Sequence, residues 1–161
     1  MIGRGAAIFG CEGPVLTARE ADFFRDYQPL GFIIFARNVE TPEKLRRLTS
    51  DLRSSVGRDA PILVDQEGGR VQRLRAPHWR EWATPLETVA KAGTSAARAM
   101  ALRSTLISAE LRDVGIDANC APVADIAGPM THPFLFNRCY GQEAAVVTEV
   151  ARAVAEAQLA M

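Results

Sequence analysis

The sequence predicts an α/β fold built on a parallel sheet, either a closed (β/α) barrel or about half of one. Short apolar segments alternate four times with segments of helical periodicity, an order typical of right-handed βαβ units. The apolar segments lack polar alternation, as expected for strands that helices cover on both faces. The segment Gly10-Cys11-Glu12-Gly13, after the first strand, lacks the glycine fingerprint of a dinucleotide-binding open sheet. These observations favour a barrel over an open doubly wound sheet.

Composition limits the size of the fold and the class of partner. The 161 residues, 48% of them hydrophobic, suffice for one ordinary domain. The 19 basic and 19 acidic side chains cancel, which argues against nucleic acid and anionic membranes as partners and favours a neutral small molecule. Three cysteines outside any CxxC pair or Cys/His cluster predict neither disulfides nor a zinc site, and hence a reduced cytoplasmic protein. We expect no signal peptide and no membrane span.

The first strand and helix are predicted from local signals. The four predicted strands are 6–10, 31–35, 61–65 and 118–121. Before the first helix, Thr17 and Glu20 form a capping box, in which each side chain can accept a bond from the other residue's backbone N–H. Phe23, Phe24 and Tyr27 then form one apolar stripe, which predicts an amphipathic helix.

The other helices follow from similar patterns. Thr41-Pro42-Glu43 supplies an N-cap, a proline at the first helical position and an acid near the positive helix end, and Gly57 ends this helix. A third helix is predicted over 96–114, with Thr94 or Ser95 as its cap. A fourth is predicted from about Glu143, continuing to Met161. The apolar positions of the second helix, at helical spacing, are Leu45, Leu48, Leu52 and Val56.

The loop after the third strand holds the first group of candidate site residues. Ligand-binding groups of parallel α/β folds lie at the carboxyl ends of strands, where Asp65 is predicted. The pair Gly68-Gly69 lets the backbone turn and approach a ligand. A carboxylate accepting bonds from hydroxyls, with Arg70 or Arg73 donating to others, suits a sugar; a structural turn cap or ion pair explains Asp65 equally well. Glu67 is not assigned as catalytic, because two acids on one loop need not have the spacing of a glycosidase pair.

A second long loop, 122–141, lies before the last predicted helix. Irregular loops of this length usually bind a ligand or cover a site. It contains Asp125, His132 and Arg138. From the residues alone, Arg138 is either a ligand contact or a solvated surface charge.

Four motifs resemble those of bacterial β-N-acetylglucosaminidases of glycoside hydrolase family 3. The segment 64–73, V-D-Q-E-G-G-R-V-Q-R, is similar to the D-x-E-G-G-R-V-Q-R signature of that family. The segment 31–38 resembles its second strand and following N-V pair, 119–125 its A-P-V-x-D stretch, and 137–141 its D-R-S-F-G, with Asn137, Cys139 and Tyr140 departing mildly. The four motifs occur in order and cover almost the whole chain.

The resemblance implies a parallel (β/α) TIM-like barrel, of which residues 1–161 would form roughly the first four βα units of a single catalytic domain. It implies removal of terminal non-reducing N-acetylglucosamine from muropeptide-like fragments, with retention of configuration, in cytoplasmic peptidoglycan recycling, without a cofactor or metal. It implies that Asp65, Arg73 and Arg138 bind the sugar, and that 121–125 forms a wall of the pocket.

The family's K-H-F-P-G-H-G loop and its later aspartate nucleophile have no counterpart in the sequence. We therefore expect no catalytic residue in this chain and no activity from it alone. An open half-barrel is also expected to self-associate through its free edges and apolar face. The alternative is a carbohydrate-binding or regulatory half-barrel without catalysis. An unrelated phosphate- or nucleotide-binding α/β enzyme is disfavoured, because no phosphate-binding loop is present.

Overall fold

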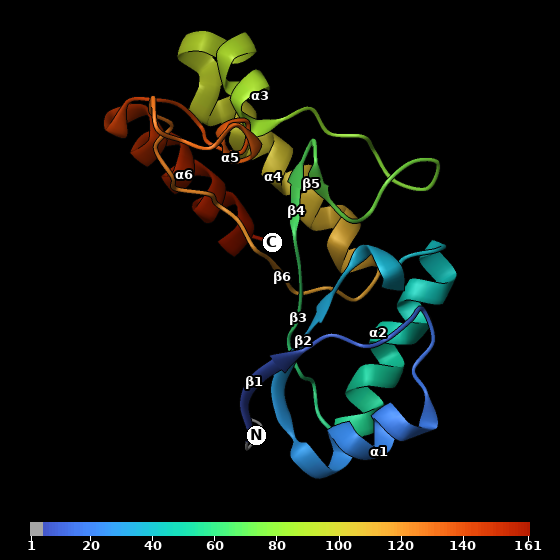
Figure 1. Cartoon of the computed structure of the whole chain (residues 1–161). Coiled ribbons are helices and arrows are strands. Elements are labelled where there is room, and N and C mark those ends of the chain that lie inside the picture. The colour runs from blue at the N-terminus through green and yellow to red at the C-terminus, as the bar shows by residue number, and fades with distance from the viewer. Residues whose placement is uncertain (1–4) are drawn as a thin grey trace.

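The computed structural model describes residues 5–161 and contains one four-stranded parallel sheet (Figure 1). The strand order is β1-β2-β3-β6, with each strand beside the next one along the chain. This sequential order is that of a barrel wall and confirms the predicted parallel α/β fold. The strands are β1 (Gly5–Phe9), β2 (Pro29–Ile34), β3 (Ile62–Val64) and β6 (Ala118–Asn119).

The four predicted strands are all present, but their ends differ from the prediction. The last strand, expected over 118–121, is only two residues long. It ends early because the backbone N–H of Ala121 turns back to the carbonyl of Asn119, at 2.7 Å. The loop after β3 contains an antiparallel hairpin that was not predicted, formed by β4 (Gln66–Gly68) and β5 (Val71–Gln72).

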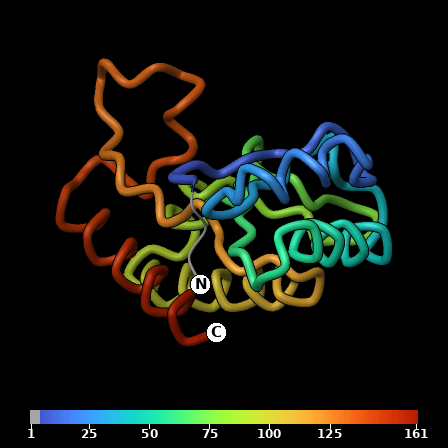
Figure 2. The backbone as a smooth tube through the Cα atoms, turned by 90° about the horizontal axis from the view of Figure 1, so that it is seen from below, coloured from blue at the N-terminus to red at the C-terminus, as the bar shows by residue number. Residues whose placement is uncertain are grey.

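Residues 5–161 form six α-helices and two short 3₁₀ turns, which lie between the strands and after the last of them. In Figure 2, α2, α4 and α6 lie along one side of the molecule, and the segment between β6 and α5 (orange) projects from one end. The helices are α1 (Ala18–Tyr27), α2 (Pro42–Val56), α3 (Pro85–Ala92), α4 (Ala96–Asp113), α5 (Pro133–Phe136) and α6 (Ala144–Leu159), and the 3₁₀ turns are η1 (Ala36–Asn38) and η2 (Gly93–Ser95).

The capping predictions for α1 and α2 are confirmed. Thr17 Oγ1 accepts from Glu20 N at 3.2 Å, and the Glu20 carboxylate accepts from Thr17 N at 3.0 Å. Thr41 Oγ1 accepts from Lys44 N, and the left-handed Gly57 ends α2. These helix ends could be predicted because the bonds join residues only three positions apart.

The predicted starts and ends of the later helices are partly wrong. Neither Thr94 nor Ser95 caps α4 with its side chain, because the chain enters α4 directly from η2. The last helix ends at Leu159 instead of continuing to Met161. Helix α3 was not predicted, although Thr84 caps it and Pro85 occupies its first position, the same signal that begins α2.

The core lies between the sheet and its helices. Phe32, Ile34, Ile62 and Val64 point from the strands into this layer and are fully buried. Figure 1 shows α1 and α2 beside β1 and β2. In the predicted stripe of α1 only Phe24 is buried; Phe23 is 48% and Tyr27 41% exposed, and both rings contact Phe9.

The other face of the sheet is partly exposed, as expected for the apolar face of a half-barrel and unlike strands that helices cover on both faces. Ile8 pairs in register with Gly31, and Ile33 pairs with Leu63. Ile33 and Leu63 alternate along their strands with the buried residues named above, so their side chains point to the opposite face. Ile8 is 42% exposed, and Ile33 and Leu63 are partly exposed. Strands of a barrel wall need apolar residues on both faces, because one face packs on helices and the other fills the barrel interior.

Over the described residues, no helix combines the length and the apolar character needed to cross a membrane.

Candidate functional site

Asp65 follows the last residue of β3 and forms an ion pair with Arg73 at the end of the β4–β5 hairpin. Arg73 Nη2 donates to Asp65 Oδ2 at 2.7 Å, and both side chains remain about one quarter exposed. One carboxylate oxygen is thus occupied by the guanidinium. The exposed remainder of the two side chains can accept from and donate to hydroxyl groups of a ligand.

Arg138, the third predicted site residue, forms a two-point ion pair with Glu67. Its Nε and Nη2 donate to the two Glu67 carboxylate oxygens at 2.8 and 2.6 Å. The Glu67 side chain is only 3% exposed, whereas that of Arg138 is 30% exposed. The hydrogen bonds that Arg138 donates to Glu67 raise the pKa of Arg138. Glu67 was not assigned a role from the sequence, and no local pattern connects it with a residue on another loop.

The two ion pairs lie at the same end of the sheet. The negative charges of Asp65 and Asp125 also act on Arg138 and contribute to its raised pKa. The electrostatic neighbours of Cys120, just after β6, include Asp65, Glu67 and Arg73. The fold therefore brings Asp65, Arg73 and Arg138 together, at the carboxyl ends of β3 and β6, where parallel α/β folds place their ligands.

The amide side chains of Asn119 and the buried Gln66 fix the hairpin that carries this cluster. Asn119, at the end of β6, accepts from Gln66 N and donates to Gln66 O, both at 2.9 Å. The Gln66 side chain bonds both backbone polar groups of Leu74 and accepts from Arg73 N. These bonds satisfy backbone groups that the short strands leave unpaired, so the glutamine of this motif has a structural role.

The glycine pair provides the turn that the sequence predicts. Gly68 and Gly69 have φ angles of +102° and +60°, a region that residues with a side chain rarely adopt. At the tip of the hairpin, the guanidinium carbon of Arg70 lies 3.3 Å from the ring centroid of Phe134 in α5. Arg70 therefore contacts the long loop, and of the two candidate arginines only Arg73 pairs with Asp65.

The motif at 31–38, through its last residue Asn38, stabilises the loop after β1. The Asn38 amide donates to the carbonyls of Cys11 and Gly13 and accepts from Phe35 N. Asn38 is fully buried, so it does not contact a ligand.

The three cysteines are free, and none has the properties of a nucleophile. Cys11 and Cys139 are buried, whereas Cys120 is exposed. Although the residue is exposed, its thiol is partly removed from water. This desolvation, reinforced by the charge of Asp65, raises the pKa of Cys120 to about 11, so the thiol is protonated at neutral pH. Among residues 5–161, no three His, Cys, Asp or Glu side chains are grouped as a metal ion would require.

A family comparison identifies the domain. Residues 15–159 match the model described as the glycosyl hydrolase family 3 N terminal domain. The chain belongs to glycosyl hydrolase family 3. A beta-hexosaminidase from Methylococcus capsulatus is 37% identical over 150 residues, covering 92% of this chain and 43% of the relative. One from Pseudomonas aeruginosa is 35% identical over 123 residues, covering 76% and 36%.

Solved structures of glycosyl hydrolase family 3 confirm the partial TIM-like barrel. NagZ from Neisseria gonorrhoeae, in complex with N-trifluoroacetyl-D-glucosamine, superposes with a TM-score of 0.87 at 26% identity. The alignment covers 98% of this chain and 47% of that one. The chain therefore spans less than half the length of the relatives it matches.

Proposed function

We propose that this chain is the sugar-orienting part of a β-N-acetylhexosaminidase that removes terminal non-reducing N-acetylglucosamine with retention of configuration. The proposal rests on the convergence of Asp65, Arg73 and Arg138 at one end of the sheet. Family membership and relatives named beta-hexosaminidase support the reaction class. The bound N-trifluoroacetyl-D-glucosamine of the Neisseria protein supports an acetamido sugar as substrate.

The residues of the site suit the recognition of a neutral pyranose. Asp65 accepts hydrogen bonds from sugar hydroxyls through the carboxylate oxygen that Arg73 does not bond, and the arginines donate to neighbouring hydroxyls. Each arginine is held by a carboxylate, so its guanidinium keeps a fixed direction before the ligand arrives. Such preorganisation increases affinity, because less side-chain entropy is lost on binding.

The same contacts argue against a catalytic role for the two acids. A retaining glycosidase needs a nucleophilic carboxylate and an acid/base. Glu67 is buried and has both oxygens bonded to Arg138, while Asp65 is paired with Arg73. We infer that the chain orients the sugar and leaves the acid/base and nucleophile to other residues of the full barrel.

We extend the proposal to the biological setting. Residues 1–161 form the N-terminal part of a single barrel domain that acts in the cytoplasm on muropeptide-like fragments during peptidoglycan recycling. The chain by itself is proposed to self-associate through its uncovered sheet face.

Sugar binding and hydrolysis test the proposal separately. N-acetylglucosamine is titrated into the ¹⁵N-labelled chain, and the dissociation constant is taken from backbone shifts. Asp65→Asn should weaken binding by about tenfold or more, because a neutral amide replaces a charged acceptor. The matched control is Glu81→Gln, whose carboxylate forms an exposed ion pair with Arg75 in the loop after the hairpin.

The expected outcome is binding without hydrolysis. The wild-type chain should release no p-nitrophenol from p-nitrophenyl N-acetylglucosaminide above the uncatalysed rate. Failure of the wild type to bind the sugar, or equal affinities for the Asp65→Asn and Glu81→Gln variants, would refute the assigned site. Hydrolysis by the chain alone would refute the division of roles.

A further inference from the structure

Arg103 in α4 is a buried guanidinium that contacts three separate segments. Its Nη2 donates to the backbone carbonyls of Glu67 and Ala83, at 2.6 and 2.7 Å. Its Nη1 donates to the hydroxyl of Thr88 in α3, at 2.6 Å. All three acceptors are uncharged oxygens, and the residue is only 6% exposed.

Burying this guanidinium costs desolvation free energy, so the need to fill space does not explain why the residue is an arginine. Removal from water lowers the pKa of Arg103. An apolar side chain would fill the same space without that desolvation cost. The fixed directions of the guanidinium donors allow one residue to hold several carbonyls, which a flexible lysine cannot do equally well.

Arg103 also explains why position 68 is glycine. A Cβ atom on Gly68 would lie 1.9 Å from Arg103 Nη2 and 2.7 Å from the carbonyl oxygen of Ala83. The guanidinium therefore occupies the space beside the hairpin backbone that a side chain would fill. The turn and the arginine fit each other, although they are 35 positions apart.

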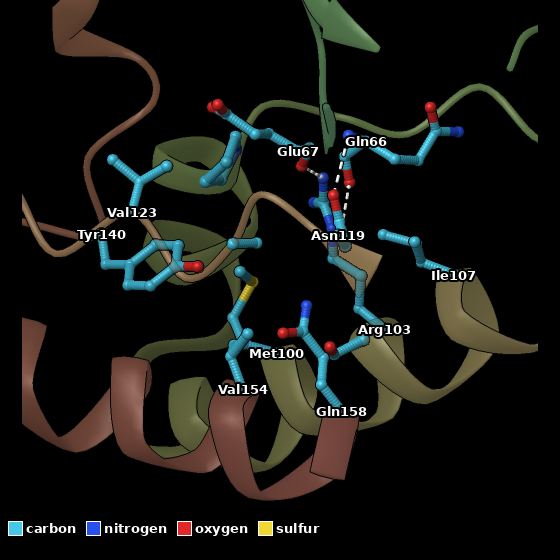
Figure 3. Close-up of a pocket in the computed structure, with 13 residues that line it drawn as sticks. Gln66, Glu67, Met100, Arg103, Ile107, Asn119, Val123, Tyr140, Val154 and Gln158 are labelled. Atoms are coloured by element: carbon cyan, nitrogen blue, oxygen red, sulfur yellow. Dashed lines mark hydrogen bonds between the residues drawn. The ribbon is translucent and has the colours of Figure 1, made fainter. Parts of the chain in front are cut away.

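Figure 3 shows how Arg103 contacts the backbone of the β4–β5 hairpin. The side chain reaches from α4 to the backbone of Glu67, while the Gln66 and Glu67 side chains extend in opposite directions from their strand. Arg103 thus holds the backbone of Glu67, and the Glu67 carboxylate holds Arg138. Asn119 holds the adjacent Gln66 backbone from the side of β6.

We propose that Arg103 is a positioning residue that sets the direction of the Arg138 guanidinium through Glu67. The sugar-binding consequence rests on the proposed function, whereas the positioning of Arg138 does not. Arg103 itself is buried, and its three side-chain hydrogen bonds all go to oxygen atoms of the protein. Its loss should rotate or loosen the Glu67 peptide and shift the carboxylate to which Arg138 is bonded.

The test uses two variants. Arg103→Met keeps a long side chain and removes the hydrogen-bond donors. Arg103→Lys keeps the positive charge and loses the planar guanidinium that donates in several fixed directions. The control is Thr49→Val, which removes a buried hydroxyl of α2 that donates to Arg46 O and Val114 O. The first readout is the Nε–H signal of Arg138 in ¹H–¹⁵N spectra, assigned by its absence in Arg138→Lys. The second is the dissociation constant for N-acetylglucosamine.

Arg103→Met should move or broaden the Arg138 signal and weaken sugar binding by about tenfold, since a displacement near 1 Å is enough for such losses. Arg103→Lys should change the Arg138 signal and the sugar affinity less than Arg103→Met does. If the methionine variant does not fold, the lysine variant alone is compared with the wild type. Thr49→Val should lower the melting temperature and leave both readouts unchanged.

An unchanged Arg138 signal in the folded Arg103 variants overturns the inference, as does an equal change in Thr49→Val. Double variants add a further criterion: in a Glu67→Gln background, Arg103→Met should move the Arg138 signal little further. A full additional shift there shows that Arg103 acts by another route. If the wild type does not bind the sugar, the proposed function fails, and the Arg138 signal still decides the positioning role.

Discussion

Glu67 and Arg138 lie 71 positions apart, and their side chains form a two-point ion pair with N–O distances of 2.8 and 2.6 Å. The pair joins the β4–β5 hairpin to the loop after β6. A second contact between the same two segments is the stacking of Arg70 on Phe134. Together they make the end of the sheet a fixed surface on which Asp65 and Arg73 also lie.

Removing the charge of Glu67 should destabilise the fold. Glu67→Gln replaces a buried charge-assisted pair with a neutral amide and should lower the free energy of unfolding by about 2 kcal/mol. Urea unfolding followed by circular dichroism measures the loss. Glu81→Gln, which breaks an exposed pair, should cost about 0.5 kcal/mol or less. Equal losses in the two variants would contradict a special role for the buried pair.

Asn119 should be sensitive to the loss of its amide group. Asn119→Ala leaves Gln66 N and Gln66 O without their partners and should cost about 2 kcal/mol. The measurement is urea unfolding at neutral pH. A loss within error of zero would show that water replaces the amide.

Asn119→Asp adds a pH dependence with a defined sign. The aspartate can still accept from Gln66 N, but only its protonated form can donate to Gln66 O. The folded state therefore favours the proton and raises the carboxyl pKa above its unfolded value. Compared with the wild type at the same pH, the variant should come closest to wild-type stability below the unfolded pKa and lose stability as pH rises through the folded one. The reverse trend in pH-dependent unfolding argues against the assigned bond.

The thiol of Cys120 reports on the charge of Asp65. With a pKa of about 11, alkylation by iodoacetamide should be slow at pH 7 and rise roughly tenfold per pH unit up to pH 10. Asp65→Asn removes a charge that raises this pKa, so the reaction at pH 8 should become faster. Intact-mass spectrometry follows it, with the buried Cys11 and Cys139 as internal controls. A slower reaction in the variant would place Asp65 away from the thiol.

The uncovered sheet face should drive self-association. Ile8 is 42% exposed on this face, and β1 and β6 have free edges among the described strands. Ile8→Glu should shift the chain toward the monomer in size-exclusion chromatography with light scattering. The control is Leu102→Glu, which is 58% exposed on α4. A monomeric wild type at every concentration, or an equal effect of both variants, contradicts this prediction.

Local signals account for the parts of the fold that were predicted correctly. Thr17 with Glu20, and Thr41 with Pro42, mark helix starts because each bond joins residues within one turn. The same signal at Thr84 and Pro85 marks the start of α3. The predicted cap of α4 was wrong because the chain enters that helix directly from the 3₁₀ turn η2, so neither Thr94 nor Ser95 caps it with a side chain.

The order of the four parallel strands and of α1, α2, α4 and α6 follows from the residues alone, as do the glycine turn at 68–69 and the positions of Asp65, Arg73 and Arg138 at strand ends or in loops. Tertiary structure decided that Arg73 pairs with Asp65, that Glu67 holds Arg138 and that Arg103 supports Glu67. The physical reason is distance along the chain. Short-range bonds follow from neighbouring residue types, whereas an ion pair across 71 positions exists only once parallel strands bring their carboxyl ends together.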